Sequence, residues 1–181
     1  MFKRSLLKAA VALAAILLVL AFTGCGGSGS GPNNYYGLDY WEFWEEDLVS
    51  DGYTKGWPAA ALSKYGLTIA NPGATVYYTI DEYEESDWTD DGFRDYIEYE
   101  LDLMIGRTST ATYNSIKGQI GSSSGWTTVM DSYYETTALD EYDDPIGTAS
   151  IISMSIPPDF TAGAGQDTLI GLTVVYKEYL E

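Results

Sequence analysis

The chain has 181 residues, with 9 Lys and Arg, 27 Asp and Glu and no His, which gives a formal charge of −18. Without histidine there is no Ser-His-Asp triad and no histidine-ligated zinc, and a single cysteine excludes an internal disulfide. The acidic balance argues against nucleic-acid binding, because that function needs Lys and Arg to neutralise phosphates.

The beginning of the chain has the pattern of a secretory leader. An unbroken apolar run of 14 residues, at positions 9–22, follows the basic residues Lys3, Arg4 and Lys8. A run of this length is typical of a signal-peptide core and is short for a transmembrane helix. An ordinary secretory signal that leaves a free cysteine, and a retained membrane anchor, are the alternative interpretations.

The apolar run ends in Ala-Phe-Thr-Gly-Cys at residues 21–25, which resembles the lipobox of bacterial lipoproteins. In that family the cysteine thiol receives a diacylglycerol, a signal peptidase cuts before the cysteine, and the new amino terminus is often acylated. The resemblance implies a signal peptide at residues 1–24 and a lipid on Cys25, with Phe22 in place of the usual Leu. It places the protein in the bacterial cell envelope, held to a membrane by its lipid.

Residues 25–34 begin with the predicted lipid site and continue as a Gly- and Ser-rich flexible tether. Gly26 stands where some inner-membrane lipoproteins have Asp, which favours the outer membrane if two membranes exist. Cleavage before Cys25 would leave 6 basic and 27 acidic residues, a charge of −21. Anionic head groups repel such a surface, so the lipid must provide the attachment.

Residues 35–181 form the predicted single ectodomain, and their patterns indicate three helices and five strands. Apolar spacings of three and four predict helices at residues 38–50 and 110–120, and Trp57-Pro58 opens a short helix that ends at Gly66. Alternating side chains predict strands at residues 75–81, 93–105, 126–135, 148–156 and 168–177.

The order of these elements predicts an α+β fold, with a mostly antiparallel sheet of about five strands and two or three helices on one face. Residues 93–105 carry apolar or aromatic side chains at six of seven odd positions and charges at four of six even positions. This alternation favours a half-buried strand that pairs with residues 75–81 as a hairpin.

The ectodomain also resembles small uncharacterised bacterial lipoproteins. The shared features are an early Trp-Pro, a Tyr-bearing helix and a Gly-Trp before a strand, here Trp57-Pro58, Tyr113 and Gly125-Trp126. This resemblance implies no activity.

One acidic segment resembles the EF-hand calcium loop. The matching residues are Asp87, Thr89, Asp91, Gly92, Asp95 and Glu98, at positions 1, 3, 5, 6, 9 and 12 of a twelve-residue window. The resemblance implies Ca²⁺ ligands at Asp87, Thr89, Asp91, Asp95 and Glu98 and at the Phe93 carbonyl, although Thr89 and Arg94 depart from the motif.

An EF-hand needs a helix from about Glu98, where the alternation predicts a strand. The competing interpretations are looser calcium binding by this loop and an acidic hairpin loop without a ligand. A second acidic cluster at residues 140–144 is either a weak cation site or, as we favour, a solvated loop.

The aromatic residues have two interpretations. One interpretation is a stacking platform for sugars or a partner protein; the other, which we favour, is that they fill the core and cover the edges of the sheet. These residues are Tyr77, Tyr78, Tyr133, Tyr134 and Trp126. No pair of carboxylates is singled out as the acid and base of a glycosidase, and no glycine-rich segment has the Lys of a phosphate-binding loop. The sequence therefore predicts a non-enzymatic binding or structural module without a cofactor, whose partner is an envelope protein or a glycan. Calcium binding, and glycan binding or processing, are the alternative functions.

Overall fold

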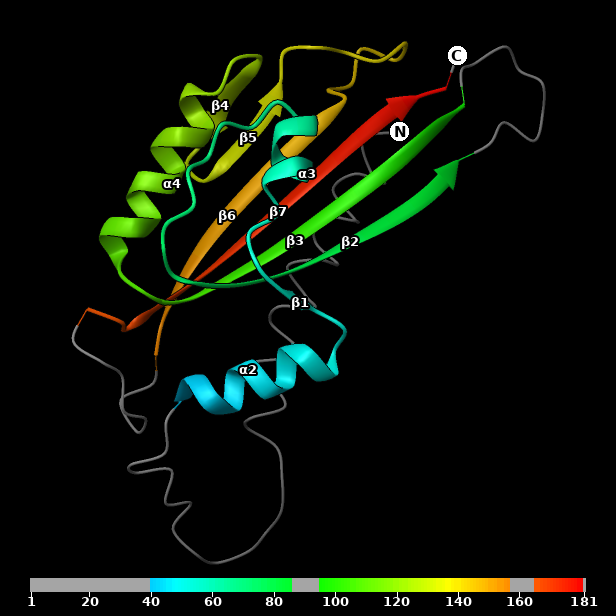
Figure 1. The fold of residues 1–181 in the computed structure, drawn as a ribbon. Coiled ribbons are helices and arrows are strands. Elements are labelled where there is room, and N and C mark those ends of the chain that lie inside the picture. Colours follow the sequence, from blue (N-terminus) through cyan, green and yellow to red (C-terminus); the bar gives the residue numbers. More distant parts are fainter. Residues whose placement is uncertain (1–39, 86–94, 157–164, 181) are drawn as a thin grey trace, which may run out of the picture. The chain divides into compact units, whose positions relative to one another are not determined.

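A computed structural model describes residues 40–85, 95–156 and 165–180 of the chain. By its internal contacts the chain divides into residues 1–34 and 35–181, and all described residues belong to the second unit. In this unit the described residues form a seven-stranded antiparallel sheet with three helices (Figure 1).

The helices are α2 (Tyr40–Ser50), α3 (Ala59–Lys64) and α4 (Thr110–Ser122). The strands are β1 (Thr54–Lys55), β2 (Thr75–Glu85), β3 (Tyr96–Thr108), β4 (Trp126–Met130), β5 (Tyr133–Thr136), β6 (Gly147–Ser155) and β7 (Thr168–Tyr179). Their order in the sheet is β1-β2-β3-β7-β6-β5-β4, so β7 lies at the centre and β1 and β4 lie at the edges.

Strand β3 confirms the alternation seen in the sequence. It pairs with β2 as an antiparallel hairpin, from Thr75 opposite Gly106 to Glu85 opposite Tyr96. Leu101, Leu103 and Ile105 are fully buried on one face of the sheet, and the intervening residues point to the other face. A helix over this segment would have mixed its charged and apolar residues on one side.

The larger hydrophobic core lies between this face of the sheet and helices α3 and α4. Leu62 from α3 and Ile116 and Ile120 from α4 pack against the buried residues of β3, β6 and β7. The Ser109 hydroxyl caps α4 by accepting a hydrogen bond from the Thr112 amide at 3.4 Å. The indole N–H of Trp126 donates to a backbone carbonyl at the end of α3, so the hydrogen-bonding capacity of this buried side chain is satisfied.

A second core lies on the opposite face of the sheet, beneath α2. Trp41, Trp44 and Leu48 form the buried side of this helix and pack against Tyr77 and Leu169. The rings of the two tryptophans approach the backbone of β3 at Gly106. A Cβ atom at this position would lie 2.6–2.8 Å from their ring carbons, so only glycine leaves room for them.

A single carboxylate fastens α2 to the sheet through polar contacts. Glu45 accepts hydrogen bonds from Lys55 Nζ at 3.0 Å, from the Tyr77 hydroxyl at 3.0 Å and from Arg107 Nε at 3.3 Å. Burial acts to raise the pKa of Glu45, but these donors outweigh it and hold the pKa below its ordinary value.

The predicted fold of about five strands with its helices on one face is wrong in two respects. The expected strand at residues 126–135 is two strands, β4 and β5, because the chain turns at Ser132, which adopts a positive φ of 69°. Strand β1 was also not expected, because two residues are too few to show an alternating pattern. Helix α2 lies on the face opposite α3 and α4, as its separate hydrophobic core shows.

Candidate functional site

The predicted ligand residues lie largely outside the described part of the chain. Cys25 belongs to the undescribed first 39 residues, and residues 86–94 contain Asp87, Thr89, Asp91, Gly92 and Phe93. Asp95 is exposed immediately before β3. Glu98 lies within β3, opposite Tyr83 of β2 and Lys177 of β7, so a strand occupies the place of the helix that an EF-hand requires there.

The acidic cluster at residues 140–144 is a hydrogen-bonded turn. The Asp140 side chain is 1% exposed and accepts bonds from the amides of Tyr142 and Asp144, at 2.9 Å each, and from Lys177 Nζ at 2.9 Å. Burial alone would raise the pKa of Asp140, but these three donors hold it below its ordinary value. Asp140 is therefore occupied in fixing this loop to β7, whereas residues 141–143 are exposed.

The five aromatic residues considered for a stacking platform do not share a surface. Tyr77 is buried under α2, whereas Trp126 and Tyr134 are buried in the core on the other face. Tyr78 and Tyr133 are half-buried. The interpretation of these residues as core is thus confirmed for the three buried side chains.

Beyond α2, the face of the sheet that carries this helix presents a group of carboxylates. Asp81 of β2 lies directly opposite Glu100 of β3, and Asp102 follows on the same face. Asp102 accepts a hydrogen bond from the Thr173 hydroxyl at 2.6 Å. Burial and the nearby Asp81 together raise the pKa of Asp102 despite this bond.

The same carboxylates affect neighbouring phenols. Burial, followed by the charges of Asp102 and other acidic residues, raises the pKa of Tyr53 to about 12. The pKa of the largely exposed Tyr83 is raised by partial desolvation and then by Asp81, Glu100 and other carboxylates. The carboxylates of this part of the sheet thus act on one another and on both phenols.

Replacing Asp102 with asparagine is expected to raise the free energy of unfolding by about 0.5–1 kcal/mol at neutral pH, because it removes one of several like charges and keeps the acceptor for Thr173. A carboxyl whose pKa is raised by folding destabilises the fold above that pKa, and this cost disappears as the pH falls through it. Urea unfolding at neutral and acidic pH measures the difference, with the exposed Glu46→Gln as control. Equal stability of wild type and Asp102→Asn at neutral pH would contradict the prediction.

The outer edge of β2 is exposed next to these carboxylates. Strand β1 pairs only with Tyr77 and Tyr78, so within the described residues no strand pairs with this edge over residues 79–85. Figure 1 shows β1 beside one end of β2 while the rest of that strand forms the border of the sheet. Ile80 is 42% exposed and Tyr83 is 52% exposed, so both faces of this edge are accessible to solvent.

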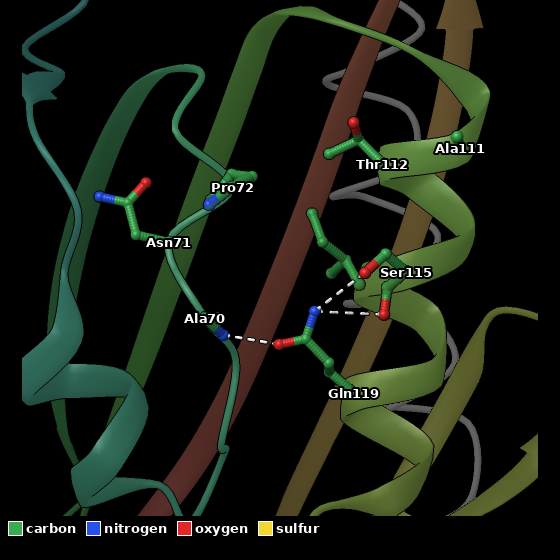
Figure 2. A pocket seen from close by; sticks show the side chains of 8 residues that line it. Ala70, Asn71, Pro72, Ala111, Thr112, Ser115 and Gln119 are labelled. Atoms are coloured by element: carbon green, nitrogen blue, oxygen red, sulfur yellow. Dashed lines mark hydrogen bonds between the residues drawn. The ribbon is translucent and has the colours of Figure 1, made fainter.

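A groove of about 360 Å³ lies between α4 and the segment that leads into β2. Figure 2 shows Thr112 and Ser115 of α4 on one side and Ala70 and Pro72 on the other. Gln119 closes one end by accepting a bond from the Ala70 amide at 2.6 Å and donating to Ser115. The side chains that line the groove carry no ionisable group, so the groove offers shape and hydrogen bonds but no acid or base.

Neither the groove nor the edge of β2 was predicted from the sequence. The predicted strand ended at Asp81 and the following acidic residues were expected in a loop, although the partner strand continues with Glu98 and Glu100 at alternate positions. The length of the alternating segment at residues 93–105, which is too long to pair with residues 75–81 alone, is the signal that would have extended β2 beyond Asp81. No pattern in the sequence identifies the groove.

Within the described residues, no three Asp, Glu or Cys side chains are grouped so that they would hold a metal ion. None of the described helices is long and apolar enough to cross a membrane. No protein-family model, curated protein or solved structure matches this chain.

Proposed function

We propose that this chain is a lipid-anchored cell-envelope protein whose ectodomain binds a partner and does not catalyse a reaction. The observation that carries the proposal is the position of the only cysteine, Cys25, at the end of the apolar run and before a Gly/Ser tether. A diacylglyceryl cysteine supplies two acyl chains, and stable membrane attachment takes about that many.

The described ectodomain supports the binding part of this proposal. Its groove is lined by hydroxyl, amide and apolar groups, and the border of its sheet exposes backbone that another chain can pair with. These features are typical of a surface that recognises a partner.

The lipid anchor is tested with Cys25→Ala in the full chain. Wild type is expected in the membrane fraction with the mass of a diacylglyceryl group on residue 25, and Cys25→Ala is expected to move almost entirely to the aqueous phase, because each buried CH₂ contributes about 0.8 kcal/mol. Ser28→Ala in the tether is the matched control and should remain with the membrane. A wild-type protein of unmodified mass, or membrane partitioning by Cys25→Ala, would overturn the proposed anchor.

A further inference from the structure

We propose that the edge of β2 at residues 79–85 is a docking site for an extended, Lys- and Arg-rich segment of another protein, which adds a strand to the sheet. This inference rests on the proposed binding function of the ectodomain and identifies the chemistry of its partner. It does not depend on the lipid.

The first support is the geometry of the edge. Seven consecutive residues of β2 lie beyond the two that β1 covers, and at about 3.4 Å per residue they offer an edge of roughly 24 Å. The other edge of β2 is held in an extended conformation by its ladder with β3, because every residue from Thr75 to Glu85 has a partner in that strand. An extended peptide can therefore pair with a preformed template.

The second support is charge. Residues 79–85 read Thr-Ile-Asp-Glu-Tyr-Glu-Glu, and Glu98, Glu100 and Asp102 follow on the neighbouring strand. The five described cations form ion pairs with Glu45, Glu178, Asp131 and Asp140, and none of these pairs involves Asp81 or Glu82. The raised pKa values of Tyr53, Tyr83 and Asp102 reflect burial together with the field of these carboxylates.

The same charges decide which strand can dock. Two copies of this edge that paired around Glu82 would place that carboxylate opposite itself, and like charges directly opposite each other destabilise a pair of strands. A segment with Lys or Arg at alternate positions would instead place opposite charges across the new ladder. A basic partner therefore fits this edge, and a second copy of the chain does not.

The test uses the full chain in detergent micelles and the peptide acetyl-Lys-Thr-Lys-Val-Lys-Thr-Lys-amide as probe. Amide chemical shifts and hydrogen exchange report where it binds. We expect shifts and slowed exchange in residues 79–85. A peptide of the same charge with proline at positions 2, 4 and 6 is the control, because proline has no N–H to donate to a ladder, and it should bind at least fivefold more weakly.

Two charge reversals on opposite edges of the sheet locate the site. Asp81→Lys is expected to lower the affinity for the probe peptide about tenfold, because it replaces an attractive cross-strand pair of charges with a repulsive one. Asp131→Lys makes the same change of charge at the β4–β5 turn, where the Asp131 side chain is 87% exposed, and should change affinity less than twofold.

Three results would overturn the proposal. The first is that the proline peptide binds as tightly as the probe, and the second is that Asp81→Lys and Asp131→Lys lower the affinity for the probe equally. The third is that the amide shifts are confined to other strands. The first two would indicate attraction by net charge alone, and the third a site elsewhere. None of them bears on membrane partitioning, so this proposal and the lipid anchor succeed or fail separately.

Discussion

Gly106→Ala is expected to lower the free energy of unfolding by about 2–3 kcal/mol, because the added methyl group collides with two buried indole rings. The new Cβ would lie 2.6 Å and 2.8 Å from ring carbons of Trp44 and 2.7 Å from a ring carbon of Trp41. Both rings belong to α2 and are packed tightly enough that the helix must shift away from the sheet. Urea unfolding measures the loss, and near-ultraviolet circular dichroism reports the altered environment of the tryptophans.

Gly118 provides a matched control for this substitution. A Cβ at Gly118 meets nothing within 4 Å, and the residue lies inside α4, where alanine is a better helix former than glycine. Gly118→Ala should therefore raise the free energy of unfolding by about 0.5–1 kcal/mol. If Gly106→Ala left the free energy of unfolding unchanged or raised it, as expected for Gly118→Ala, the close packing of α2 on Gly106 would be contradicted.

Glu45→Ala is expected to lower the free energy of unfolding by about 2 kcal/mol at neutral pH, because it removes the carboxylate that accepts hydrogen bonds from Tyr77 and Arg107 under α2. Lys55 contributes little to this figure, since its side chain is 61% exposed and its ion pair is screened by water. Chemical unfolding of wild type and variant measures the difference. The exposed neighbour Glu46→Ala is the control and should change stability by less than about 0.5 kcal/mol.

The pH dependence distinguishes an ionic role of Glu45 from simple packing. Folding lowers the pKa of Glu45, so its stabilisation is fully present above the ordinary value of 4.5 and is lost as the pH falls through the folded-state value. The difference between wild type and Glu45→Ala should therefore shrink as the solution is acidified below this ordinary value. A difference that stays constant over this range would show that the side chain acts through packing.

The elements that could be predicted are those in which a regular pattern of apolar residues continues over many positions. Residues 93–105 alternate over enough positions to distinguish strand from helix, and their hairpin with residues 75–81 is present in the structure. The division between β4 and β5 escaped prediction because Asp131-Ser132 lacks the glycine that usually marks a two-residue hairpin turn, and Ser132 itself adopts the positive φ. Which face α2 covers also escaped prediction, because it depends on Gly106, a contact distant in sequence.

Less of the candidate site was predictable. The separation of Tyr77 from Tyr78 and of Tyr133 from Tyr134 follows from strand alternation, but their burial depends on which helix covers each face. The acidic residues after Asp81 have the composition of a loop, and only pairing with β3 holds them in a strand. The groove between α4 and residues 70–72 is created by packing, which leaves no periodic pattern in the sequence.

The position of β7 at the centre of the sheet has a consequence for the order of folding. Strands β1–β3 and β4–β6 form two groups with no ladder between them, and β7 joins the groups by pairing with β3 and β6. β7 is also the last of these strands in the sequence. The sheet therefore becomes continuous only when residues 168–179 pair with β3 and β6, and pairing between segments so distant in sequence slows folding.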